Sequence, residues 1–192
     1  MKTTDTRLAD GERRILAGYV GKTLEKYRCS ELGTTRHVAW GVVELSVEGH
    51  ACSLVHKETQ IDYFGEFEDI ATTSVREVEA EEFACELSNV RMVDHAVGQK
   101  IQDIRIYEDS KFKSKDGVDI FRFATTVAIV LQLERSQVVF SGSPITEAID
   151  IYRGPGAEKK IRPVEADECE LGFCFRTERA VINLKGWLGG QS

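Results

Sequence analysis

Residues 119–133 read D-I-F-R-F-A-T-T-V-A-I-V-L-Q-L. Apolar side chains stand at most alternate positions of this run, and many of them are aromatic or β-branched. A period of two places successive side chains on opposite faces of a strand, whereas a helix requires a period near 3.6. The stretch therefore predicts a long β-strand. Its apolar face is expected to carry Phe121, Phe123, Val127, Ile129, Leu131 and Leu133.

A shorter run, 37–47, has the same alternation and is followed by Glu48-Gly49. Such a dipeptide between two alternating runs predicts a two-residue hairpin turn, which fixes the register of the next strand. The expected cross-strand pairs are Val47 with His50, Leu45 with Cys52 and Val43 with Leu54. In the longer run the corresponding pairs are Leu133 with Ser136, Leu131 with Val138 and Ile129 with Phe140.

The remaining patterns also favour strands. Further strands are predicted at Leu24–Ser30, Ile61–Phe64, Ile101–Tyr107, Ala148–Tyr152, Leu171–Phe175 and Ala180–Leu184, with a loop at Ser110–Gly117. One short helix is expected at Gly11–Gly18, with Asp10 as its N-cap. The predicted fold class is mainly β, with α+β at the margin.

Two segments of the chain are nearly the same. Residues 75–82 read V-R-E-V-E-A-E-E and residues 161–168 read I-R-P-V-E-A-D-E. Four more pairs follow in the same order: 20–28 with 97–105, 45–48 with 131–134, 61–64 with 149–152, and 85–87 with 169–171. Collinear matches favour a tandem duplication. We expect an N-terminal segment (1–19) and two β-rich pseudo-repeats (20–96 and 97–192), packed into one compact pseudo-symmetric unit.

The net charge of −7 lies wholly in the first half of the chain. Residues 1–96 hold 18 acidic and 11 basic residues, whereas residues 97–192 hold 14 of each, which together make the 32 and 25 of the chain. A negative protein is repelled by nucleic acid and by anionic membranes, so neither is expected as a partner. The excess acid is either an aid to solubility or a surface for a basic protein partner.

The acidic stretch I-D-Y-F-G-E-F-E-D at 61–69 is the candidate partner-binding surface. Exposed aromatic side chains beside charges make good interface anchors. The alternatives are a solvated acidic face and aromatic side chains that belong to the core. The predicted surface consists of Asp62, Phe64, Glu66, Phe67, Glu68 and Asp69.

His50, Cys52 and His56 stand on one face of a predicted strand, and imidazole and thiolate are zinc ligands. However, Leu54 shares that face and Cys52 corresponds to Val138 in the second repeat, which favours a core position with the histidines at its rim. No metal is predicted, and the three residues stay candidates. The five cysteines are Cys29, Cys52, Cys85, Cys169 and Cys174. This odd, scattered set, in a chain without a recognisable secretion signal, predicts reduced thiols and a cytoplasmic location.

No catalytic motif is present, and no cofactor is predicted. A-G-Y-V-G-K-T at 17–23 resembles a phosphate-binding loop, but it lacks the first glycine and lies between a helix and a strand in the wrong order. We therefore expect a non-enzymatic interaction protein, immunity- or inhibitor-like at most, whose acidic first repeat engages a basic protein. The alternative is a small-molecule or metal-binding protein, conceivably an enzyme, with a site between the repeats or at His50, Cys52 and His56. The sequence does not indicate an oligomeric state.

Overall fold

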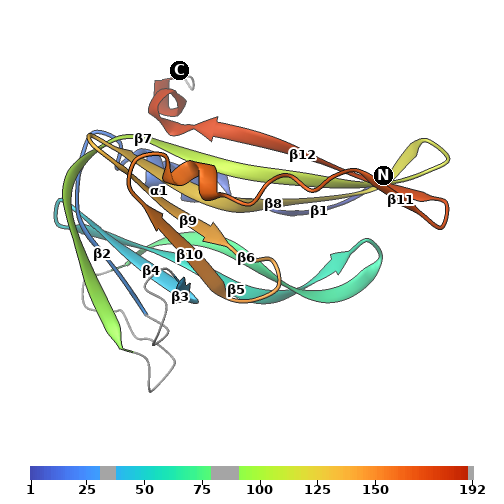
Figure 1. Cartoon of the computed structure of the whole chain (residues 1–192), viewed down its shortest axis with the longest axis horizontal. Coiled ribbons are helices and arrows are strands. Elements are labelled where there is room, and N and C mark those ends of the chain that lie inside the picture. The colour runs from blue at the N-terminus through green and yellow to red at the C-terminus, as the bar shows by residue number, and fades with distance from the viewer. Residues whose placement is uncertain (31–37, 79–90, 190–192) are drawn as a thin grey trace.

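The computed structural model describes residues 1–30, 38–78 and 91–189. This part of the chain is mainly β, as predicted, with a single α-helix and twelve strands in one hydrogen-bonded sheet (Figure 1). The strand pairings are antiparallel except that of β1 with β8, which is parallel.

The elements follow one another in this order. The first half contains β1 (Lys2–Thr6), α1 (Asp10–Ala17), β2 (Thr23–Ser30), β3 (Val38–Trp40), β4 (Val42–Val47), β5 (His50–Tyr63) and β6 (Glu66–Val78). The second half contains β7 (Met92–Lys115), β8 (Val118–Leu133), β9 (Gln137–Gly142), β10 (Ala148–Arg153), the 3-10 helix η1 (Ala157–Lys160), β11 (Glu168–Glu170), β12 (Phe173–Asn183) and the 3-10 helix η2 (Leu184–Gly189).

Two antiparallel meanders make up most of the sheet, β2–β4–β5–β6 and β7–β8–β9–β10, joined by pairing of β2 with β7. The matched segments 20–28 and 97–105 fall on β2 and β7, and 45–48 and 131–134 both lead into hairpin turns. However, 61–64 ends β5, whereas its match 149–152 is β10, the fourth strand of its meander. Residues 79–90, which include Cys85 and most of the motif at 75–87, lie outside the described residues. The duplication therefore stays a prediction, and β7 runs through its expected boundary at 96–97.

The chain from 38 to 47 closes the sheet on itself. Its first part, β3, pairs with β10, and its second part, β4, pairs with β2 and β5. Gly41 lies between them at φ +71°, a conformation that favours glycine. Its N–H donates to the carbonyl of Glu147 at 2.8 Å, and its carbonyl accepts from the N–H of His56 at 2.6 Å. The strands β4, β2, β7, β8, β9, β10 and β3 therefore form a closed circuit, in which neighbours are hydrogen-bonded except that β3 is joined to β4 through the chain at Gly41.

The core fills this circuit, and the predicted hairpin registers place its side chains. Val43 pairs with Leu54 and Leu45 with Cys52, and the pairs expected between β8 and β9 are confirmed as well. Large buried core side chains include Tyr27, Leu45, Leu54, Ile104, Ile106, Ile129, Leu131 and Phe140. On the opposite face of β8 and β9, Ala157 and Ile161 from η1 and its C-terminal end cover a second, smaller cluster.

Helix α1 begins one residue earlier than predicted, and Asp10 is not its N-cap. Ala9 occupies that position, and its N–H donates to the carboxylate of Glu12 at 2.6 Å. The other oxygen of Glu12 accepts from the N–H of Val75 at 2.7 Å. Glu12 therefore satisfies the helix terminus and ties α1 to β6.

Beyond the closed circuit, two long hairpins project toward the same end of the molecule (Figure 1). One is the two-stranded β5–β6 ribbon, hereafter the ribbon, in which the predicted strand at Ile61–Phe64 is only the end of β5. Its turn has positive φ at both Phe64 and Gly65, the geometry of a tight two-residue hairpin. Strand β6 was not predicted.

The other projection is the five-stranded layer, with strand order β11–β12–β7–β8–β1. The loop predicted at Ser110–Gly117 is wrong, because β7 continues to Lys115 and turns only at Asp116-Gly117. Leu171 and Gly172 form a turn, so the strands predicted at Leu171–Phe175 and Ala180–Leu184 are one strand, β12.

The predicted single apolar face of β8 is also interrupted. Its pairing with β7 shifts between Tyr107 and Glu108, where β8 carries one extra residue at Val127. Ile129 lies in the core, whereas Phe123, beyond this bulge, contacts the ribbon. A bulge of this kind redirects side chains along the strand, and alternation alone does not reveal it.

Candidate functional site

The ribbon twists along its length, so that different faces point toward the rest of the molecule at its base and at its tip. At its base Leu54 and His56 are buried in the molecule, yet Tyr63, at a position of the opposite parity, packs edge-to-face on Phe123 of the layer. Their ring centroids are 5.1 Å apart. Two-stranded ribbons twist more strongly than wide sheets. Because of this twist, the face that is internal at the base points away from the layer near the tip.

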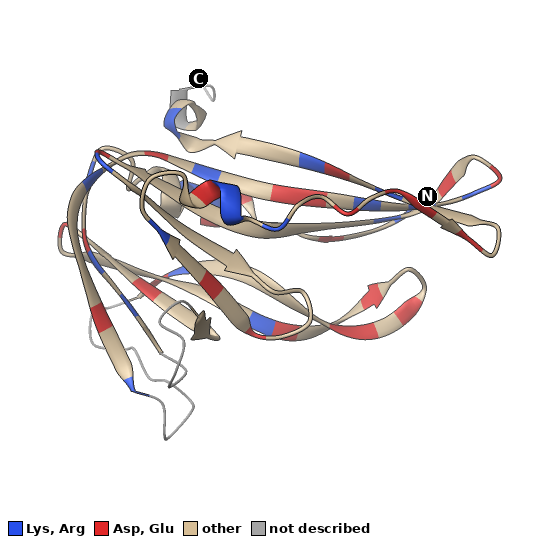
Figure 2. Ribbon diagram, in the orientation of Figure 1, with Lys and Arg blue, Asp and Glu red and all other residues tan. Residues whose placement is uncertain are grey.

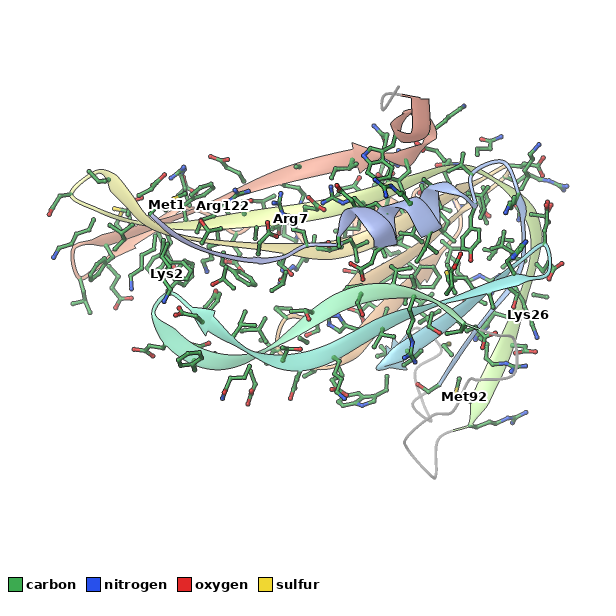
Figure 3. The ribbon with its side chains drawn as sticks, turned by 180° about the vertical axis from the view of Figure 1, so that it is seen from behind. Met1, Lys2, Arg7, Lys26, Met92 and Arg122 are labelled. Carbon is green, nitrogen blue, oxygen red and sulfur yellow. A yellow bond between two sulfur atoms is a disulfide. The ribbon has the colours of Figure 1, made fainter. Side chains whose placement is uncertain are left out.

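The tip of the ribbon is fastened to the layer by aromatic and polar contacts. The ring of Phe64 lies 5.1 Å from Phe121 and 5.5 Å from Phe175, measured between centroids. Lys2 on β1 reaches across to bind the carboxylate of Asp62 (Figure 3), and the Thr4 hydroxyl donates to the Asp62 carbonyl at 2.8 Å. The pKa of Asp62 is lowered by the hydrogen bond from Lys2. Both Asp62 and Phe64 therefore serve internal contacts.

The other four residues of the predicted surface are exposed. Phe67 is 75% exposed. Asp69 is exposed on the same face of β6, and Glu66 and Glu68 are exposed on the opposite face. Within the described part of the chain, none of these three carboxylates forms an ion pair. Figure 2 shows the acidic positions gathered toward the tip of the ribbon. The structure thus divides the six predicted residues into two that make internal contacts, Asp62 and Phe64, and four that are exposed near the tip of the ribbon.

The three candidate metal ligands differ in how deeply they are buried. His50 is exposed at the start of β5, whereas Cys52 is fully buried in the core. His56 is 2% exposed, with Nδ1 3.0 Å from the Thr73 hydroxyl and Nε2 2.7 Å from the Ser143 carbonyl. Burial lowers the pKa of His56 and raises that of Cys52 to about 12. Among the described residues no group of three or more His, Cys, Asp or Glu side chains is arranged to hold a metal.

The prediction of reduced thiols is wrong for two cysteines. Cys169 and Cys174 form a disulfide between β11 and β12, where they stand directly opposite each other. The turn at Leu171-Gly172 creates this cross-strand pair, which the spacing of the cysteines did not suggest. Both residues are exposed, whereas Cys29 and Cys52 are buried.

A cavity of about 80 Å³ lies where the ribbon meets the layer. Its walls come from both predicted repeats and from the segment after η1. The lining residues are Tyr63, Ile70, Asp109, Lys111, Phe123, Thr125, Pro144, Arg162, Glu165 and Thr177. The N–H of Ala71 donates to the Pro144 carbonyl at 3.2 Å, which fixes one wall against the ribbon.

Most of the charge around this cavity is paired. Lys111 Nζ lies 2.8 Å from Glu165, and Arg179 binds both carboxylate oxygens of Asp109 at 2.6 and 2.8 Å. Burial opposes the charge on Lys111, but Glu165 outweighs it, so the pKa of Lys111 is raised; the hydrogen bond from Lys111 lowers the pKa of Glu165. Arg162 is the remaining charged lining residue, and it forms no ion pair with any residue that the structure describes.

Sequence reasoning placed a site between the repeats but assigned none of these lining residues to it. They lie far apart in the chain, and the two hairpins must twist before Tyr63 meets Phe123. Arg162 matches Arg76 in the paired segments 161–168 and 75–82. A charge that recurs in both copies can bind a ligand, but an ion pair or capping contact within each copy was the preferred interpretation.

Comparison with known proteins found no matching family model, no matching curated protein and no matching solved structure. None of the helices in the described residues has the length and apolar character needed to cross a membrane.

Proposed function

We propose that this protein is a non-enzymatic binding protein whose ribbon docks on a basic protein partner. The observation that carries the proposal is Phe67, a large apolar ring that is 75% exposed near the tip of the ribbon. Asp69 lies on the same face of β6, and Glu66 and Glu68 are exposed on the opposite face, so the tip carries three carboxylates without an ion-pair partner among the described residues. An exposed aromatic anchor at an acidic tip is an arrangement that a complementary basic surface would bury.

Two further features support this role. The ribbon projects from the closed circuit, so its outer face is accessible to a large partner (Figure 1). Its tip is fastened to the layer through Lys2, Thr4 and Phe64, so the surface is pre-organised and little ordering entropy is lost on binding.

The test is charge reversal on one tip with a matched control on the other. The triple variant E66K/E68K/D69K is expected to slow association with a partner captured from the native host by at least about tenfold and to remove its salt dependence. F67A is expected to speed dissociation instead. The control D167K/E168K/E170K changes three exposed acids on the β11–β12 tip. Equal effects of both triple variants would leave only a non-specific charge effect and reject the ribbon as the docking surface.

The cavity between the ribbon and the layer favours a second candidate function, the binding of a small molecule. Convergent polar and apolar side chains around a partly enclosed space are typical of ligand sites. A metal at His50, Cys52 and His56 has no such support, because His50 is exposed, Cys52 is buried in the core, and both ring nitrogens of His56 contact protein groups.

A further inference from the structure

The cavity is small and is bounded on several sides by different elements. Tyr63 and Ile70 come from the ribbon, Phe123 from β8, and Arg162 from the segment that follows η1. A volume of about 80 Å³ is several times the roughly 10–15 Å³ that a cavity needs to hold one water molecule. It therefore has room for a compact ligand of a few heavy atoms.

The lining carries two acidic and two basic side chains, and Glu68 and Glu168 act electrostatically on Tyr63 and Lys111 from nearby. Lys111 is paired with Glu165, and Asp109 is paired with Arg179. Arg162 is half-buried and acts electrostatically on Glu165, but it has no ion-pair partner in the described structure. A planar guanidinium in this state is suited to a carboxylate, which it binds through two parallel hydrogen bonds.

The rest of the lining is largely apolar. Ile70, Phe123 and Pro144 supply hydrocarbon surface, and Thr125 and Thr177 add hydroxyl groups. A ligand that satisfies both halves of the lining carries one negative charge and a short apolar chain.

We propose that this cavity binds a small organic monoanion, a short-chain carboxylate, with Arg162 pairing with the carboxylate group. The proposal rests on the second candidate function, and it adds the chemical class of the ligand. The chain of the ligand packs against Phe123 and Ile70, while the Lys111–Glu165 pair closes the site without itself needing a counterion.

The test compares three four-carbon probes, butyrate, 1-butanol and butylammonium, by titration into isotope-labelled protein followed by amide chemical shifts. Butyrate is expected to give saturable shifts at Lys111, Thr125 and Thr177, and butylammonium to give none. R162M is expected to weaken butyrate binding at least about tenfold, as loss of a charge-assisted bond should. The matched control R135M removes an exposed arginine from the β8–β9 turn and is expected to bind butyrate normally.

Each outcome is decisive. Equal saturable binding of butyrate and 1-butanol would keep the small-molecule function and overturn the anion preference. Saturation by none of the three probes would overturn both. Equal butyrate affinity in R162M and R135M would remove Arg162 from the site. T177L, which places bulk against the cavity, is expected to abolish binding while the amide spectrum stays folded, and full butyrate binding by this variant would place the site elsewhere. Butyrate binding that survives E66K/E68K/D69K separates this site from the docking surface on the ribbon.

Discussion

The ribbon and the five-stranded layer both project from the same closed circuit. They differ in how many of their side chains make contacts within the protein. In the layer, β7 and β8 are flanked by β12 and β1, and lysines lie over aromatic rings, as Lys113 does 4.6 Å from the centroid of Phe173. Beyond Val55, where its pairing with β4 ends, the ribbon has no flanking strand among the described elements, and the acids near its tip form no ion pair with a described residue. Flanking strands pair with the edges of a projecting hairpin and stabilise it by contacts within the protein. A hairpin without flanking strands stays accessible to a partner.

The largest expected difference concerns one phenylalanine from each projection. Phe123 is 6% exposed and packs on Tyr63, whereas Phe67 is 75% exposed. F123A should lower the free energy of unfolding by about 3–5 kcal/mol, because a buried ring leaves a cavity. F67A should change it by no more than about 0.5 kcal/mol. Urea denaturation of the two variants measures both values, and similar losses would show that the ribbon's outer face is also part of the core.

The base of the ribbon provides the next test. H56Q removes a buried ring that contacts Thr73 and the Ser143 carbonyl, and we expect it to cost about 1–3 kcal/mol. H50Q, on the same strand but exposed, is the matched control. If H50Q lowers the free energy of unfolding as much as H56Q does, the contacts of the buried His56 ring are not what stabilises the base of the ribbon.

His56 also predicts a pH dependence. Burial lowers its pKa in the folded protein below the usual 6.5, so the unfolded chain binds a proton first as the pH falls. Stability should therefore be fully present above about pH 6.5 and should decrease below it until the folded-state pKa is reached. Thermal unfolding between pH 7.5 and 5 should show this decrease in the native chain and in H50Q. The slope should be reduced in H56Q, and an unchanged slope there would assign the effect to other groups.

A smaller effect is expected at the β11–β12 tip. The disulfide joins residues five apart in the sequence, and cross-links of short loops remove little entropy from the unfolded chain. C169S/C174S should lose at most about 2 kcal/mol. Hydrogen exchange should quicken at the β11–β12 tip and remain unchanged in the ribbon. Faster exchange in the ribbon as well would mean that the two tips are coupled.

The smallest expected change is at the latch between β1 and the ribbon. T4V removes the hydroxyl that donates to the Asp62 carbonyl and should cost about 0.5–1.5 kcal/mol. T3V alters the neighbouring, exposed threonine of the same strand and is expected to be neutral. A neutral T4V would mean that Phe64 and Lys2 hold the ribbon without this hydrogen bond.

The sequence predicted the parts of the fold that depend on local alternation. The registers around Val43, Leu45 and Ile129 follow from hairpin turns and period-two patterns, and these were correct. The hydrophobic alternation did not reveal where the strands twist or where the bulge at Val127 interrupts the alternation. Twist and bulges arise from pairing between strands that are distant in the sequence.

The same limit explains the candidate site. The exposed residues of this stretch are adjacent in the sequence, so they could be recognised there as one acidic and aromatic cluster: Glu66, Phe67, Glu68 and Asp69. Asp62 and Phe64 belong to the same stretch, but their roles are decided by Lys2 and Phe121, which no local pattern connects to them. The cavity around Arg162 was missed for the same reason.

Gly41 has a consequence for the order in which the chain folds. The two meanders consist of neighbouring hairpins, whose short loops close quickly. The pairing of β3 with β10 joins segments from opposite halves of the chain, and so does that of β1 with β8. We therefore expect the meanders to form first and the circuit to close late, with the amides of Ala39 and Gly41 among the last to gain protection during refolding.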